Sequence, residues 1–149
     1  EYCTVTSYAS MGYDLHITRQ ENWYDENSGK RISLIEWKVF LEGDTEMRLD
    51  NFAEVTTTSG ETIRIESEGL SVWTKYSGNG IEGNFVWFDY REGNIVCKNP
   101  DNEIIKKMLS IASQLNAKVQ GDDGELYEES AGKVRIVKAG AQKPWWKFW

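Results

Sequence analysis

Short segments in which apolar and polar residues alternate fill the middle of this 149-residue chain, and turns that contain glycine separate them. Alternation with a period of two is typical of strands that bury one face, and glycine adopts the backbone angles that tight turns require. We therefore expect about four or five antiparallel strands in this region. They should cover residues 53–58, 61–66, 70–76, 85–90 and 94–98.

Two segments have the pattern of helices. Ser33 and Glu36 have the spacing of a capping box, which predicts a helix over about 33–42 that Gly43 ends in a left-handed conformation. Asn99 is a natural N-cap before Pro100, and a broad apolar stripe follows through Leu115. This pattern predicts a second helix over about 100–116.

A further strand is expected at about 12–19 before the first helix, and residues 117–120 and 133–138 should supply one or two more after the second. The predicted class is α+β. We expect a single domain over 11–138, with a mainly antiparallel sheet of about five to six strands packed with two helices.

Both ends of the chain differ from this body. Residues 1–10 are weakly patterned and are interpreted as a leader or extension, whereas 139–149 form a basic tail rich in tryptophan. We expect this tail to dock on the protein or a second subunit, with contact to a membrane as the less favoured alternative. No apolar stretch is long enough to span a bilayer. The expected docking residues are Trp145, Trp146, Lys147, Phe148 and Trp149.

Charge divides the chain unevenly. Residues 1–132 carry 12 basic and 24 acidic side chains (12 − 24 = −12), and the last 17 residues carry five basic ones and no acidic one. An acidic body disfavours nucleic acid as a partner and favours capture of a basic protein. The densest acidic run lacks the spacing of a calcium-binding loop, so we interpret it as a partner-binding surface, with a solvated hairpin tip as the alternative. Its residues are Asp122, Asp123, Glu125, Tyr127, Glu128 and Glu129.

Few residues suggest catalysis. His16 is the only histidine, and Cys3 and Cys97 are far apart in the sequence, so no zinc motif or disulfide framework is indicated. The Gly-rich run at 78–83 matches GxGxxG, but a predicted strand follows it where nucleotide binding requires a helix. We expect a partly exposed His16, no metal, no cofactor, no enzymatic activity and a cytoplasmic location. Catalysis by His16 with Asp14 is the alternative.

Four motifs carry a resemblance: MGYDLHITR at 11–19, EW at 36–37, KNPD at 98–101 and AKVQGDDGE at 117–125. With them the chain resembles, over about residues 11–127, a family of small uncharacterised bacterial proteins, whose compact acidic members are similar to immunity proteins of toxin systems. This resemblance and the negative charge favour an acidic interaction protein, an immunity protein that binds and neutralises a basic cognate toxin.

Two other functions stay open on the sequence. One is a small enzyme or ligand-binding domain that uses His16 and carboxylates in a cleft lined by Trp23, Trp73 or Trp87. The other is a membrane-associated accessory protein that acts through its tryptophan-rich tail.

Overall fold

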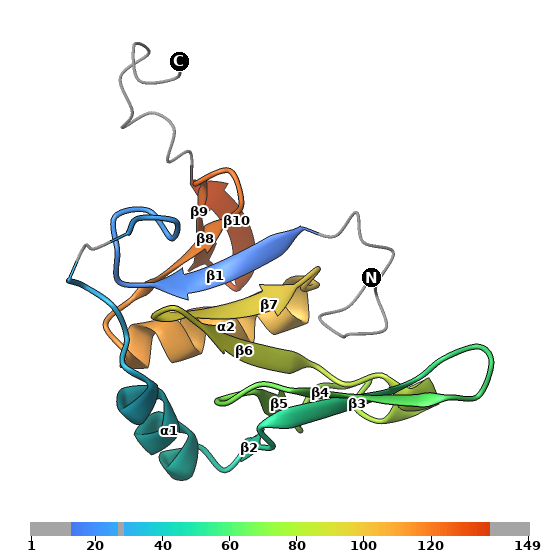
Figure 1. The fold of residues 1–149 in the computed structure, drawn as a ribbon. Coiled ribbons are helices and arrows are strands. Elements are labelled where there is room, and N and C mark those ends of the chain that lie inside the picture. Colours follow the sequence, from blue (N-terminus) through green and yellow to red (C-terminus); the bar gives the residue numbers. More distant parts are fainter. Residues whose placement is uncertain (1–12, 27–28, 138–149) are drawn as a thin grey trace.

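The structure is a computed structural model that describes residues 13–26 and 29–137 (Figure 1). An eight-stranded sheet dominates it, in the order β10-β9-β8-β1-β7-β6-β5-β2, and every neighbouring pair is antiparallel. Strands β3 and β4 pair with each other in a separate hairpin. The elements are β1 (Asp14–Thr18), α1 (Leu34–Gly43), β2 (Met47–Leu49), β3 (Phe52–Thr56), β4 (Thr62–Glu66), β5 (Ser71–Trp73), the 3₁₀ turn η1 (Ile81–Gly83), β6 (Trp87–Arg91), β7 (Asn94–Lys98), α2 (Asn102–Gln114), β8 (Lys118–Gly121), β9 (Leu126–Ser130) and β10 (Lys133–Val137).

The predicted α+β class and both helices are confirmed, but the predicted number of strands is wrong. The described residues contain ten strands, eight of them in the main sheet, instead of five to six. Two short or strongly charged segments account for much of the difference. Strand β2 has only three residues, and β9 lies within the acidic run that the sequence pattern suggested was a loop.

Helix α1 begins as the sequence predicts. The Ser33 hydroxyl accepts a hydrogen bond from the Glu36 backbone N–H at 3.0 Å, and the Glu36 carboxylate accepts one from the Ser33 N–H at 3.2 Å. Arg19 also binds Glu36, at 2.7 Å, and these hydrogen bonds lower the pKa of Glu36 to about 2. The helix ends at Gly43 without the left-handed residue that we expected there, because extended Asp44 forms the C-cap.

The N-cap of α2 differs from the prediction. Asn99 has a left-handed backbone with φ of 50° and is not the cap. Instead, the Asp101 carboxylate accepts the hydrogen bond from the Ile104 N–H at 2.9 Å. Helix α2 therefore starts two residues after Pro100, at Asn102.

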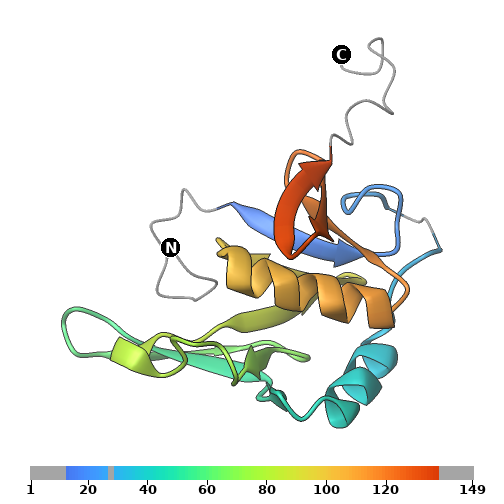
Figure 2. The same ribbon diagram turned by 180° about the vertical axis from the view of Figure 1, so that it is seen from behind.

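One face of the sheet carries the main core. Figure 2 shows α2 lying across this face, and the apolar side of α2 packs on residues of β1, β7 and β8. On the opposite face, which Figure 1 presents, no helix covers β1 or β7. The fully buried residues between α2 and the sheet include Ile17, Ile95, Ile104, Met108, Ile111 and Val119.

A second, smaller core joins the β3–β4 hairpin to the neighbouring part of the sheet. It consists of Ala53, Leu70, Val72 and Trp87, with Phe85 packed against it.

Among the described residues, no helix is both long and apolar enough to cross a membrane. The expected leader (1–10) and tail (139–149), with Trp145, Trp146, Lys147, Phe148 and Trp149, lie outside the described residues, so their roles stay predictions.

Candidate functional site

Polar side chains gather on the face of the sheet that α2 leaves uncovered. Asp14 and His16 are two residues apart on β1, so their side chains point to the same side. The antiparallel register places Val96 of β7 and Gln120 of β8 directly beside His16. Asn94 lies two residues before Val96 on the same face, so Asp14, His16, Asn94 and Gln120 place four polar side chains on this part of the sheet.

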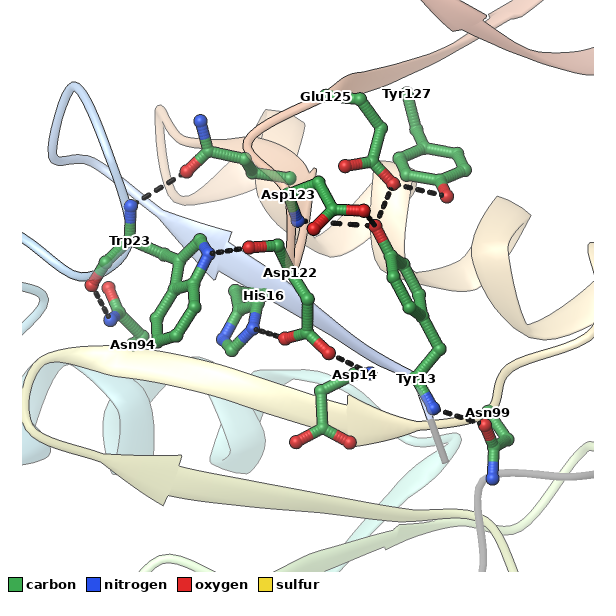
Figure 3. Close-up of polar contacts among 11 residues, drawn as sticks. Tyr13, Asp14, His16, Trp23, Asn94, Asn99, Asp122, Asp123, Glu125 and Tyr127 are labelled. Carbon is green, nitrogen blue, oxygen red and sulfur yellow. Dashed lines mark hydrogen bonds and ion pairs between the residues drawn. The ribbon is translucent and has the colours of Figure 1, made fainter. Parts of the chain in front are cut away.

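His16 is buried, with 4 % of its surface exposed, so the expectation of a partly exposed histidine is wrong. The segment after β1 folds back over the open face and lays the indole of Trp23 on the imidazole (Figure 3). The ring centroids are 3.9 Å apart and the planes differ by 4°. A loop, and not a helix, therefore covers this face of the sheet over His16. The alternation of apolar and polar residues along β1 predicts the face on which His16 lies, but it does not predict that a loop covers that face.

Asp122 is the acidic partner of His16. Its Oδ1 lies 2.9 Å from His16 Nε2, and its Oδ2 accepts a hydrogen bond of 2.9 Å from the Asp14 backbone N–H. The indole Nε1 of Trp23 donates to the Asp122 carbonyl oxygen at 3.3 Å. The sequence suggested Asp14 as the carboxylate nearest to His16, but the turn after β8 supplies Asp122 instead, 106 residues away along the chain.

Three amide side chains hold the backbone of Trp23. Its N–H donates to Gln120 Oε1 at 2.7 Å, and its carbonyl oxygen accepts from Asn94 Nδ2 at 2.8 Å and from Gln20 Nε2 at 3.0 Å. All three amides are at least 95 % buried. They fix the indole over His16, and sequence reasoning missed them. The sequence contained one usable signal: Gln120 is an amide residue that follows Val119 in a strand whose other residues are largely buried.

Burial lowers the pKa of His16, and the hydrogen bond to Asp122, which acts in the opposite direction, offsets this only in part. His16 is therefore neutral at pH 7. A carboxylate accepts but does not donate, so the single ring proton lies on Nε2 and Nδ1 keeps its lone pair. Nδ1 is buried and has no hydrogen-bond partner in the described part of the chain.

A cavity of about 330 Å³ opens beside this histidine. Asp14 Oδ1 and Asn94 Oδ1, like His16 Nδ1, are buried and without a partner among the described residues. All three belong to residues that line the cavity. Its lining consists of Asp14, His16, Trp23, Tyr24, Asp25, Glu26, Arg31, Arg91, Glu92, Asn94, Val96 and Asp122.

The other residues of the expected partner-binding surface contact the protein itself. Glu125 Oε2 accepts hydrogen bonds from the hydroxyls of Tyr13 and Tyr127, and burial together with Glu125 raises the pKa of both phenols. The Asp123 backbone N–H donates to the Tyr13 hydroxyl at 3.2 Å. Figure 3 shows this tyrosine and carboxylate cluster beside the His16 pocket.

The two remaining carboxylates of that surface lie on β9 and pair with basic residues. Glu128 pairs with Arg135 of β10, and Glu129 lies 3.9 Å from Lys106 of α2. Thus the structure brings Asp122 to the pocket and leaves the rest of the run outside it. A toxin-binding role of these residues stays a prediction.

Of the three tryptophans expected in an aromatic cleft, Trp23 alone lines the His16 pocket, because Trp73 and Trp87 border two other hollows. Within residues 13–26 and 29–137, no three histidine, cysteine, aspartate or glutamate side chains are grouped to hold a metal ion.

Comparisons with protein-family models, curated proteins and solved structures found no match, so the resemblance noted in the sequence also stays a prediction.

Proposed function

We propose that this protein is a ligand-binding domain that takes up a small polar molecule in the His16 pocket. The observation that carries the proposal is the set of three buried acceptor atoms beside one cavity, on Asp14, His16 and Asn94. Buried polar atoms in folded proteins nearly always have a partner, and leaving one unsatisfied costs about 1–3 kcal/mol. A ligand that donates hydrogen bonds recovers this free energy.

The lining of the pocket also suits a small molecule. Ligand sites combine aromatic surface with a few fixed polar groups, and here Trp23 and Tyr24 supply the aromatic surface. The buried amides of Gln20, Asn94 and Gln120 hold Trp23 in place before any ligand arrives. Such preorganisation reduces the entropy that binding costs.

Binding is favoured over catalysis. The residues that line the pocket include no serine, threonine or cysteine, the residues whose hydroxyl or thiol a histidine most often activates as a nucleophile. The His16–Asp122 pair instead fixes the ring and its proton. We therefore retain the expectation of a non-enzymatic protein.

Capture of a basic toxin, the function favoured by the sequence, has less support from the geometry. Asp122 is engaged with His16, Glu125 with two tyrosines, and Glu128 with Arg135. These internal contacts explain the placement of the acidic residues without a partner protein, so we do not make an immunity function the leading proposal.

The compartment is part of the proposal. Cys97 is buried and disulfide-bonded, and the chain's other cysteine, Cys3, lies outside the described residues. Disulfides persist in oxidising compartments and are rare in the cytosol. We therefore propose an oxidising compartment in place of the cytoplasmic location expected from the sequence.

A ligand screen followed by nuclear magnetic resonance tests the proposed function. Amines, alcohols, sugars and organic acids are titrated into ¹⁵N-labelled protein while the indole N–H signal of Trp23 is observed. We expect at least one class to shift this signal in a saturable way. Absence of a saturable shift with every class would contradict the proposal.

A filled pocket provides the matched control. Val96→Phe adds a phenyl ring at a residue that lines the cavity, and Val39→Phe makes the same change on the exposed side of α1. We expect Val96→Phe to abolish the shift and Val39→Phe to keep it. Equal binding by both variants would place the ligand elsewhere.

A further inference from the structure

We infer that the ligand of the His16 pocket is a small organic cation with a primary ammonium group, an inference that rests on the proposed function. Its first support is the hydrogen-bonding polarity of the pocket. His16 Nε2–H is used by Asp122, so the unpaired Nδ1 is an acceptor. Asn94 uses its amide N–H on the Trp23 carbonyl, which leaves its oxygen unpaired. With Asp14 Oδ1, all three unpaired atoms are acceptors.

An ammonium group matches this polarity. It has three N–H donors and no acceptor, whereas a hydroxyl has one donor and a carboxylate has none. In the register of β1 with β7, Asp14 lies opposite Lys98 and His16 opposite Val96, so Asp14 and Asn94 lie on opposite sides of His16, and an ammonium group contacts His16 together with one of them. His16 is 4 % exposed and Asn94 5 %, so these acceptors are built into the floor of the pocket and are not surface groups.

The charge of the lining provides independent support. Five carboxylates line the cavity, from Asp14, Asp25, Glu26, Glu92 and Asp122, against the two guanidinium groups of Arg31 and Arg91 (2 − 5 = −3). The neutral imidazole adds no charge, and Arg91 is already paired with Asp89 at 2.9 Å. A cation is attracted to this lining, and an anion is repelled.

Size and aromatic surface narrow the class. A cavity of about 330 Å³ is at the small end of ligand pockets, which suits a molecule of a few carbon atoms. Trp23 and Tyr24 present aromatic surface to the same cavity, and aromatic faces attract ammonium groups. A neutral polyol satisfies the acceptors but leaves the excess negative charge unbalanced.

Three probes of equal chain length test the inference: 1,4-diaminobutane, 1,4-butanediol and succinate, titrated at constant ionic strength. We expect saturable shifts of the Trp23 indole and His16 ring signals with the diamine, at least tenfold weaker binding of the diol, and no binding of succinate. If the diol or succinate binds and the diamine does not, the inferred class is wrong while the ligand-binding function stands. If no probe binds and the wider screen also finds no ligand, both are wrong.

A charge-matched pair of variants locates the cation. Asp14→Asn keeps the size of the side chain and removes its charge, and we expect the affinity for 1,4-diaminobutane to fall about tenfold, which corresponds to about 1.4 kcal/mol. Asp50→Asn makes the same change in net charge beside Arg48, next to the edge strand β2 and away from the pocket, and should change the affinity less than twofold. Equal losses in both variants would show attraction to net charge alone and would overturn the assignment to Asp14.

Discussion

Removal of the Asp122 side chain should destabilise the protein far more than removal of another carboxylate from the same hairpin. Asp122 accepts hydrogen bonds from His16 Nε2 and from the Asp14 backbone N–H, both at 2.9 Å. The imidazole is buried, with a side chain that is 5 % exposed, so in Asp122→Ala its N–H loses its partner in a place where water has little access.

The magnitude follows from these two contacts. A hydrogen bond to a charged group contributes about 1.5–3 kcal/mol. The Asp122 side chain is 33 % exposed, so water replaces part of what is lost and the lower end of that range applies. Two bonds then give a loss of about 3 kcal/mol in the free energy of unfolding, or a melting temperature lower by about 6–12 °C for a chain of this size.

Glu128→Ala is the control. Glu128 lies on β9 and pairs with Arg135, and the two side chains are 41 % and 64 % exposed. An exposed ion pair of this kind contributes less than about 1 kcal/mol. Urea unfolding of both variants at pH 7 gives the comparison. Similar small losses in the two variants would refute the conclusion that the His16–Asp122 contact is a structural element of the pocket.

Three further outcomes are expected. Because the pKa of folded His16 is lowered, the unfolded chain binds a proton that the folded protein does not, so stability is complete above pH 6.5 and falls as the pH drops toward the folded pKa. Urea unfolding at pH 7 and 5 should show this loss, with a slope of at most about 1.4 kcal/mol per pH unit, and His16→Gln should reduce it; an unchanged slope would contradict the assignment. In Gln120→Ala, hydrogen exchange at the Trp23 backbone N–H should accelerate, because that N–H loses its 2.7 Å acceptor; protection equal to that of the wild type would contradict the conclusion that Gln120 holds the Trp23 backbone. Thiol titration of unfolded, unreduced protein should find Cys97 unreactive, and a reactive Cys97 would rule out the proposed oxidising compartment.

Local patterns predicted the helices well. The capping box at Ser33 and the apolar stripe through Leu115 depend on residues three or four positions apart. Helix α2 lies within its predicted range, and α1 begins and ends one residue later than predicted. Strand β9 was missed because Glu128 and Glu129 are adjacent in it, so it lacks the alternation of apolar and polar residues and has the composition of a solvated loop. The number of strands was underestimated for the same reason, because segments without a clear alternation were not recognised as strands.

The site depends on contacts that no local pattern contains. His16 and Asp122 are 106 residues apart, and Trp23 and Gln120 are 97 apart. The sequence identified His16, a carboxylate partner and Trp23 as candidates, but it predicted an exposed imidazole beside Asp14. Only the pairing of β1 with β8 places the turn that contains Asp122 next to the histidine.

The position of the ring proton on His16 is the most direct measurement of the central claim, and the chain has a single histidine, so its signals need no assignment. Long-range ¹H–¹⁵N correlation spectra at pH 7 distinguish a protonated ring nitrogen from an unprotonated one. We expect a neutral ring with the proton on Nε2 and a lone pair on Nδ1, and we expect 1,4-diaminobutane to shift the Nδ1 signal. A proton on Nδ1, alone or in a doubly protonated ring, would contradict an acceptor-lined pocket.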